Sequence, residues 1–408
     1  MTQLGIAAPD AVTGPPRLEA RNLTKHFPVY GQMPGRAALA AGSRFRGRNV
    51  SPSSTSGRVV HAVEDISLAL AAARVTALVG ESGSGKSTLA RVLARLLRPT
   101  SGQLLLDGSP VPPGRKDSRD YARQVQMVLQ DPFSSLNAVH DVRYHLARPL
   151  LVHRLRPAGV SLDDAISGLL ERVALTPADQ YIRKYPHELS GGQRQRVAIA
   201  RALAVQPRVL LADEPVSMLD VSIRLGILNL LRDLSDSERL AILYITHDIA
   251  SARYLADTIA VMYAGQMVET GPAQAVTDQP AHPYTQLLLS AAPDPDREGR
   301  LAVSTGPDGW APDGAATTLP ARRGAPPSLV APPQGCRFHP RCPHAMAICA
   351  QTSPPGFETA AGHVSACWLH ATDLGAAQAA PLSLVTSPGP ADSIRQPAPT
   401  PRREESGA

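Results

Sequence analysis

The stretch from residue 80 to residue 88 has the residue types and spacing of a phosphate-binding loop. Its letters, GESGSGKST, fit the pattern G-x-x-x-x-G-K-[ST]. In such a loop the backbone amides of residues 83–86 wrap the phosphates, Lys86 contacts the outer two, and the Ser87 hydroxyl binds Mg²⁺. The predicted nucleotide-binding positions are Gly80, Glu81, Ser82, Gly83, Ser84, Gly85, Lys86, Ser87 and Thr88.

Two acidic residues follow a buried apolar run in RVLLADEP. The run Val209–Ala212 predicts a strand, and Asp213 and Glu214 come directly after it. Asp213 suits an indirect hold on Mg²⁺, and Glu214 suits the general base that activates water against a γ-phosphate. Acids that merely end a strand are the alternative, but this reading does not explain why they accompany a phosphate loop.

Two further polar residues come after predicted strands. His247 ends the strand in LYITHDI; such a histidine is often only a hydrogen-bonded core residue, but beside a γ-phosphate it can bind the phosphate or orient water. Gln130, in VQMVLQDPFSSLN, can reach Mg²⁺ or the same water. We predict Glu214, His247 and Gln130 as the catalytic group, and Ser87, Gln130 and Asp213 as the residues that hold Mg²⁺.

The stretch HELSGGQRQRVAIARAL predicts a second anion site that contains no lysine. Ser190 is a good N-cap, and the apolar residues after it have helical spacing. Gly191 and Gly192 leave the amides of the first turn uncovered, and such a helix end attracts phosphate. Taken alone, the stretch favours the alternative of an ordinary capped surface helix, and the anion site depends on the rest of the chain.

The elements that must position these residues read as an α/β domain. From VVHAVEDISLALAAARVTALVG to about residue 290, strand-like runs such as Val75–Val79 and Ile242–Ile245 alternate with helical patterns, which favours a mostly parallel sheet. After the phosphate loop, Leu89, Val92, Leu93, Leu96 and Leu97 predict a helix with one apolar face.

Composition divides the 408 residues into parts. The net charge of +6 suggests anionic partners but does not distinguish nucleotides from nucleic acid or lipid. No apolar run is long enough for a membrane span, and the start lacks the basic-then-apolar order of a signal peptide, so we expect a cytosolic chain.

The predicted parts are a disordered lead (1–17), an α/β domain (18–290) with an exposed insertion (31–58) and a helical subdomain (138–189), a linker (291–333), a cysteine segment (334–370) and a disordered tail (371–408).

All four cysteines, Cys336, Cys342, Cys349 and Cys367, fall in the segment 334–370. Their spacing is neither the C-x₂-C pair of a zinc ribbon nor a ferredoxin pattern. Four thiols in a cytosolic chain favour a metal over disulfides. The alternative is a small packing motif with buried thiols.

Taken together, the residues 80–88, Gln130, 189–193, Asp213–Glu214 and His247 resemble the ATP-binding cassette of ABC transporters over about residues 18–290. The resemblance implies a P-loop fold with a helical subdomain, and an ATPase of two cassettes arranged head to tail. It implies that Ser190, Gly191, Gly192 and Gln193 of one cassette close over ATP held by the other. It also implies that Phe27 stacks on adenine and that Asp220, in SMLD, crosses the dimer; a strand-core aromatic is the alternative for Phe27.

The C-terminal part resembles one branch of that family. HPYTQLLLSAAP (282–293) and GCRFHPRCPHAMAIC are similar to the ATPase subunits of oligopeptide and dipeptide importers, with QDPFSSLN closer to the F-type subunit. The resemblance implies the following partners: a second ATPase subunit in a heterodimer, two membrane permeases and an extracytoplasmic substrate-binding protein, but no nucleic acid. It also implies that the chain is a peripheral protein at the cytoplasmic face of the membrane. It also implies that the four cysteines hold a [4Fe–4S] cluster, with zinc or no metal as alternatives.

Two other readings of the function stay open at this level. The same machine can import nickel or an oligosaccharide, because the cassette does not touch the cargo. A non-transport ABC ATPase is the more distant alternative. Such proteins commonly carry tandem cassettes or a long coiled-coil insertion, and the sequence shows neither.

Overall fold

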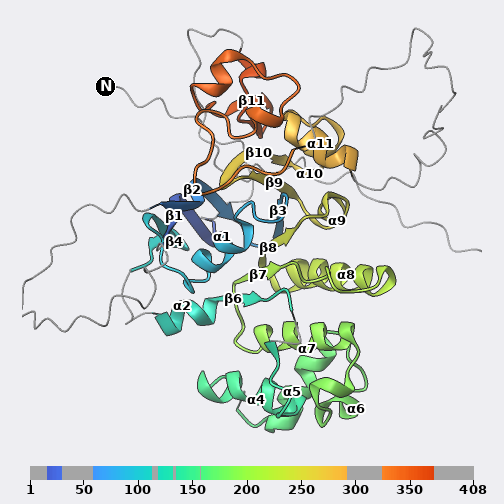
Figure 1. The fold of residues 1–408 in the computed structure, drawn as a ribbon. Coiled ribbons are helices and arrows are strands. Elements are labelled where there is room, and N and C mark those ends of the chain that lie inside the picture. Colours follow the sequence, from blue (N-terminus) through green and yellow to red (C-terminus); the bar gives the residue numbers. More distant parts are fainter. Residues whose placement is uncertain are drawn as a thin grey trace, which may run out of the picture.

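The computed structural model describes residues 16–29, 58–112, 118–131, 135–156, 158–291 and 324–371 (Figure 1). The predicted lead, insertion and tail therefore lie outside the described residues, apart from positions 16, 17, 58 and 371. Arg17 is already part of the fold, since its guanidinium lies 2.9 Å from the Asp107 carboxylate. Much of the predicted linker, residues 292–323, is also outside the described ranges.

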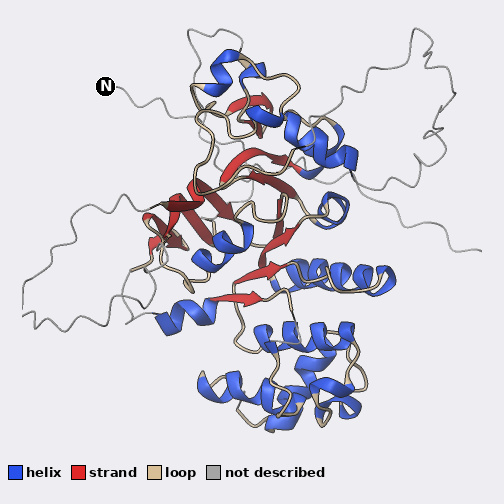
Figure 2. Ribbon diagram, viewed as in Figure 1, coloured by secondary structure: helices blue, strands red, loops and turns tan. Residues whose placement is uncertain are grey.

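The main sheet has eight described strands in the order β11-β12-β10-β9-β3-β8-β7-β6. Figure 2 colours the strands red and the helices around them blue. The neighbours from β9 to β6 are all parallel, and β10, β11 and β12 join antiparallel. The sheet is thus mostly parallel, as predicted. The bounds are β3 Arg74–Val79, β6 Val125–Val128, β7 Val209–Asp213, β8 Ala241–Thr246, β9 Thr258–Tyr263, β10 Gln266–Pro272, β11 Phe357–Ala360 and β12 His363–Ser365.

The central strands are buried on both faces, which explains their nearly continuous apolar sequence. In β8, Ile242 and Tyr244 pack into a cluster with the helices, whereas Leu243 and Ile245 pack into a second cluster on the opposite face. All four side chains are fully buried. The sheet therefore separates two cores.

The second core lies between the main sheet and a small antiparallel sheet of order β2-β1-β4-β5. Its strands are β1 Leu18–Pro28, β2 Val59–Leu70, β4 Ser101–Leu106 and β5 Ser109–Pro110. Helix α1, Lys86–Leu93, packs into the same core through Leu89 and Leu93. The prediction that this helix reaches Leu97 was wrong: Arg95 has a left-handed φ of 57°, and Leu96 is 65% exposed.

Most other helices cover the opposite face or form a separate lobe after β6 (Figure 1). The lobe contains the predicted helical region, and Ser161 caps α5 by accepting the N–H of Asp164 at 3.0 Å. The helix bounds are α2 Ser118–Gln124, α4 Val142–Val152, α5 Leu162–Arg172, α6 Asp179–Ile182, α7 Gly191–Leu203, α8 Val221–Glu238, α9 Ile249–Leu255, α10 Ala273–Asp278 and α11 Pro283–Ala291, with short 3₁₀ turns η2 Pro186–Glu188, η3 His339–Arg341, η4 Ala347–Ala350 and η5 Trp368–His370.

The cysteine segment is built onto the main sheet. Strand β12 pairs with β10 at Glu269–Ser365 and Thr270–Val364. The packed part also begins before residue 334, where the sequence predicted the linker to end: the His61 N–H donates to the Leu329 carbonyl at 2.8 Å. Leu329 belongs to a single apolar pair in a proline-rich stretch. Such a pair is too short to show the periodicity of a helix or strand, so composition alone does not indicate that it packs against the fold.

Within the described residues, none of the helices combines the length and the apolar character that a bilayer crossing requires.

Candidate nucleotide site and cysteine pocket

The predicted phosphate loop connects β3 to α1, which is the strand–loop–helix arrangement that phosphate binding requires. Gly85 precedes the helix with a φ of 104°, and a Cβ there would lie 2.1 Å from the Ala62 carbonyl oxygen. Only glycine fits this position, because both the conformation and the close approach exclude a side chain. The helix N-terminus therefore presents bare amides to the loop.

Lys86 is buried in the loop and holds it closed on itself. Its Nζ donates to the Gly80 carbonyl at 2.7 Å and to the Glu81 carbonyl at 2.8 Å. Burial lowers the pKa of Lys86, and the nearby carboxylates of Glu214 and Asp213 oppose this shift. These two bonds use N–H donors of Lys86 that would otherwise bind a phosphate.

Ser87 and Asp213 meet beside the loop, although 126 positions separate them in the sequence. The Ser87 hydroxyl donates to the Asp213 carboxylate at 3.0 Å, and burial raises the pKa of Asp213 against the effect of this hydrogen bond. A hydroxyl and a carboxylate oxygen are hard ligands of the kind Mg²⁺ prefers. The pair fits the predicted Mg²⁺ site.

The three residues predicted as the catalytic group lie together. The Glu214 carboxylate accepts the Gln130 side-chain amide at 3.0 Å and lies 3.3 Å from Nδ1 of His247. Gln130 thus contacts Glu214, and no hydrogen bond joins it to Ser87 or Asp213 among the described interactions. Glu214 has a left-handed φ of 46° and follows β7 directly, while His247 follows β8. Adjacent parallel strands therefore deliver both groups to one edge of the sheet.

The second predicted anion site begins α7 as expected. Ser190 accepts the Gln193 N–H at 3.3 Å, and the Gln193 side chain accepts the Ser190 N–H at 3.0 Å. Gly192 has a packing role that the sequence did not indicate, since a Cβ there would lie 2.4 Å from Cγ2 of Ile223. Figure 1 shows α7 in the helical lobe, apart from α1.

Phe27 and Asp220 both lie outside the buried core. Phe27 lies in β1 opposite Val60 and is half-buried, with Nζ of Lys25 at 4.9 Å from its ring centroid. It is not a core aromatic. Asp220 is exposed and precedes α8 without a side-chain capping bond.

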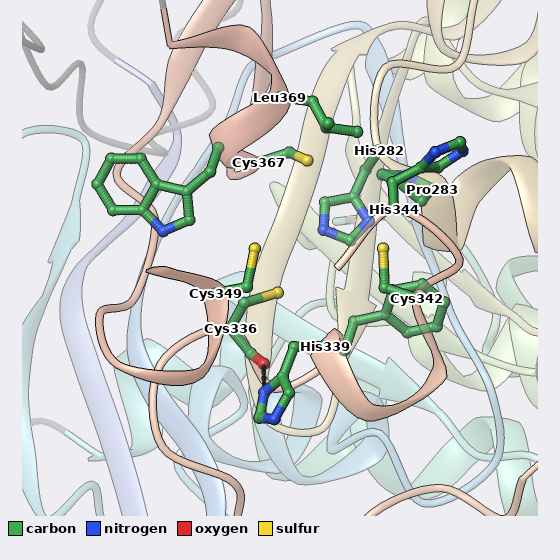
Figure 3. A pocket seen from close by; sticks show the side chains of 11 residues that line it. His282, Pro283, Cys336, His339, Cys342, His344, Cys349, Cys367 and Leu369 are labelled. Atoms are coloured by element: carbon green, nitrogen blue, oxygen red, sulfur yellow. Dashed lines mark hydrogen bonds between the residues drawn. The ribbon is translucent and has the colours of Figure 1, made fainter. Parts of the chain in front are cut away.

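The four cysteines line one pocket and are all free thiols (Figure 3). The segment around them is tied together by the Cys336 N–H, which donates to the Cys349 carbonyl at 2.8 Å. Burial raises the pKa of Cys336 to about 11 and that of Cys367 to about 12. Histidines 282, 339 and 344 line the same pocket.

One further cluster has metal-ligand character, formed by His26, His61 and Glu64. Among the described residues, it is the set whose ligand atoms all lie within 4.8 Å of one another. However, Nη2 of Arg337 lies 3.3 Å from the Glu64 oxygen that both histidines contact. The site already holds a permanent cation, which opposes the entry of a metal ion.

Sequence reasoning missed two residues that contact the phosphate loop. The Tyr284 hydroxyl accepts the Glu81 N–H at 2.8 Å, and the Arg341 guanidinium makes two hydrogen bonds to the Glu81 carboxylate. Tyr284 lies within HPYTQLLLSAAP and Arg341 within GCRFHPRCP, two stretches that indicated only the family branch. Neither stretch carries a local signal that points to a loop some 200 residues away.

The fold and this site define an ABC-type ATPase cassette. The ABC transporter family matches residues 63–217, and the oligopeptide/dipeptide transporter C-terminal region matches residues 268–308 and 310–349. Among solved structures, cbiO1 from Clostridium perfringens, part of the ABC transporter complex cbiONQ, is similar with a TM-score of 0.52 and 26% identity, covering 65% of this chain and 92% of that one. The dimeric structure of the bacterial cassette MJ0796 is similar with a TM-score of 0.51 and 25% identity, covering 63% and 98%.

Curated relatives are similar over nearly their whole length. The di/tripeptide transport ATP-binding protein DppF of Pseudomonas aeruginosa is 40% identical over 340 residues, 83% of this chain and 93% of its own. The oligopeptide transport ATP-binding protein AppF of Bacillus subtilis is 38% identical over 355 residues, 86% of this chain and 97% of its own. The chain belongs to the family of ATP-binding subunits of oligopeptide and dipeptide ABC transporters.

Proposed function

We propose that this chain hydrolyses ATP to drive the import of di- or oligopeptides through an ABC transporter. The observation that carries the proposal is the convergence of Gln130, Glu214 and His247 beside the pair Ser87–Asp213 and the phosphate loop. The C-terminal family match and the peptide-transport relatives support peptides as cargo.

In this proposal Glu214 is the general base. Its carboxylate removes a proton from the attacking water, while Gln130 and His247 fix the orientation of the carboxylate. Ser87, Asp213 and Gln130 would hold Mg²⁺, which neutralises charge on the β- and γ-phosphates when it is bound. Lys86 leaves the carbonyls of Gly80 and Glu81 and contacts the phosphates instead.

The ATP site is completed by a second cassette. Ser190, Gly191, Gly192 and Gln193 would close over ATP held by the partner, because a helix N-terminus carries backbone N–H groups without intrahelical partners and the positive end of the helix dipole. Asp220 would lie at the same dimer interface, and Phe27 would stack on adenine. The chain would pair with a different ATPase subunit and act with two permeases and a substrate-binding protein at the cytoplasmic face of the membrane.

We further propose that Cys336, Cys342, Cys349 and Cys367 hold a [4Fe–4S] cluster. A tetrahedral zinc site has Zn–S bonds of about 2.3 Å and hence sulfur atoms about 3.8 Å apart. No three of the cysteine sulfurs lie within 4.8 Å of one another among the described residues. Thiolates that each bind a different iron atom are spaced more widely, which agrees with this pocket.

His282 supports the fit of this pocket to a cofactor. It is fully buried, and its Nδ1 accepts the Tyr284 N–H at 3.0 Å, whereas its Nε2 has no partner. Burial lowers the pKa of His282 to about 4, so the ring is neutral with its proton on Nε2. Sulfur atoms of a bound cluster would accept this unpaired N–H.

The transport proposal is tested by uptake in the source organism with the chain deleted. Complementation with the wild type should restore uptake of labelled peptides, whereas Lys86→Ala and Glu214→Gln should not. If the deletion strain instead lost uptake of nickel or an oligosaccharide, the chain would still be a transporter ATPase, but its cargo would not be peptides. Normal uptake of all three by the deletion strain would overturn the proposal.

The cluster is tested separately by anaerobic purification with iron, sulfide and zinc assays. Four iron and four sulfide per chain are expected from the chemistry of the cluster, with loss of both in Cys342→Ser. His344→Ala is the matched control, because His344 lines the pocket without being a predicted ligand. An iron-free protein that Cys342→Ser leaves unchanged would overturn the cluster.

A further inference from the structure

The cysteine segment and α11 both contact the same residue of the phosphate loop. Nη1 of Arg341 lies 2.9 Å from Oε2 of Glu81, and Nη2 lies 2.9 Å from Oε1. The Tyr284 hydroxyl accepts the backbone N–H of Glu81 at 2.8 Å. Glu81 is therefore held by its main chain and by its side chain, from two elements that lie more than 200 positions later in the sequence.

Aromatic residues hold the Arg341 side chain in position for its ion pair with Glu81. Its guanidinium lies 5.7 Å from the ring centroid of Tyr263 and 5.8 Å from that of Phe338, and Nη1 is 3.3 Å from the Tyr263 hydroxyl. The rings of Tyr263, Tyr284 and Phe338 pack against one another with centroids 4.5–5.5 Å apart. The Arg341 side chain is only 12% exposed, so its ion pair with Glu81 is partly shielded from water.

The position of Glu81 affects phosphate binding in two ways. Its carbonyl accepts Nζ of Lys86, so the backbone of Glu81 sets the place from which the lysine approaches a phosphate. Its carboxylate is a negative charge within the loop that wraps the phosphates, close enough to act on Lys86. An unpaired carboxylate at this position would repel ATP, and the bidentate pair with Arg341 neutralises it.

We propose that Arg341 and Tyr284 are positioning residues for the phosphate loop, through which the cysteine segment and α11 maintain the affinity for ATP. This inference rests on the proposed ATPase function. It makes the segment 324–371 part of the nucleotide site, although no residue of that segment is expected to touch ATP. Arg341 lies one residue before Cys342, so the same turn serves the loop and the pocket.

The test is a cycle of four proteins, the wild type, Arg341→Ala, Glu81→Gln and the double variant, with MgATP affinity measured by calorimetry. Arg341→Ala should weaken binding about tenfold, since a hydrogen-bonded charged group contributes on this scale. The KM for ATP should rise more than kcat falls. Glu81→Gln in the Arg341→Ala background should restore most of the affinity, because the repelling charge is gone.

The rescue shows whether Arg341 acts through the charge of Glu81. If Arg341→Ala weakened binding for another reason, such as a displaced loop backbone, removing the Glu81 charge would not restore binding. Arg172→Ala is the matched control, because Arg172 also makes two bonds to a glutamate, Glu238, on the surface away from the loop. Its affinity should equal that of the wild type.

Three results would overturn the inference, and they have different consequences for the ATPase proposal. A wild type that binds ATP, with Arg341→Ala within twofold of it, would remove the positioning role and leave the ATPase proposal intact. A double variant no tighter than Arg341→Ala would also remove it. A wild type that binds no ATP would remove both proposals together.

Discussion

The buried carboxylate of Glu269 joins three parts of the C-terminal half of the fold. It is 0% exposed and accepts the N–H groups of Ala281 at 2.8 Å and His282 at 2.9 Å, and it lies 2.7 Å from Nε2 of His363. Strand β10 is thereby bound to the start of α11 and to β12. We predict that Glu269→Gln detaches this junction while leaving the volume of the side chain unchanged.

The size of the effect follows from the two oxygens. Oε1 of Glu269 contacts the Ala281 N–H and His363, and Oε2 accepts the His282 N–H. A glutamine keeps the most hydrogen bonds when its oxygen lies at the Oε1 position and its NH₂ group faces His282. One charge-assisted hydrogen bond is lost and one buried N–H is left without an acceptor. We expect the free energy of unfolding to fall by about 3 kcal/mol, the upper end of the cost of leaving a buried N–H without its charged acceptor.

The chain offers a direct reporter for this measurement. It contains two tryptophans, Trp310 and Trp368, and Trp368 lies in the C-terminal segment against Phe357 with its indole N–H donating to the Thr352 carbonyl. In a Trp310→Phe background, urea unfolding followed by fluorescence monitors Trp368 alone. Glu269→Gln should shift the midpoint to lower urea.

Glu358→Gln is the control, because Glu358 is an exposed carboxylate that also accepts one backbone N–H, from Gly362 at 3.1 Å. It should change the free energy of unfolding by less than about 1 kcal/mol. If Glu269→Gln had no larger effect than Glu358→Gln, the buried junction would not stabilise this half of the fold.

Three further predictions concern the site and the helical lobe. Glu214→Gln should keep ATP affinity and lower kcat by about 10²–10⁴ in a steady-state ATPase assay, the usual contribution of a general base; an unchanged kcat would refute that role. Gly85→Ala should abolish ATP binding in calorimetry, because its Cβ would lie 2.1 Å from the Ala62 carbonyl oxygen; retained binding would show that the loop can shift. Burial lowers the pKa of His145 below 6.5, so its stabilising contribution is present above pH 6.5 and is lost as the pH falls below it. His145→Gln should therefore weaken the dependence of the melting temperature on pH between 7 and 5, and identical curves would contradict this.

Short motifs with strong local rules were predictable from the sequence. The phosphate loop, the Ser190 cap and the strand before Asp213 depend on spacing, capping and apolar runs within about 20 residues, and the structure has these elements at the predicted places. The parallel pairing of β7 and β8 then brings Glu214 and His247 to one edge of the sheet. The sequence indicated this, because both residues follow predicted strands and the carboxyl ends of parallel strands meet at one edge.

Contacts made across long stretches of sequence were not predictable in this way. The pairing of β12 with β10 and the reach of Arg341 to Glu81 depend on how the chain returns after residue 324. A three-residue strand has too few positions to show a period. The end of α1 was missed for a different reason, since Leu96 continues the apolar spacing although the backbone has already turned at Arg95.

The pairing of β12 with β10 has a consequence for any shortened form of the protein. Strand β10, Gln266–Pro272, would be an open sheet edge if residues 324–371 were removed, because β12 occupies its outer side. Its residues Met267 and Val268 are apolar and buried, and unpaired edges of this kind recruit strands from other molecules. A chain cut before residue 324, by a protease or a premature stop, should therefore aggregate instead of persisting as an uncoupled ATPase in the cell.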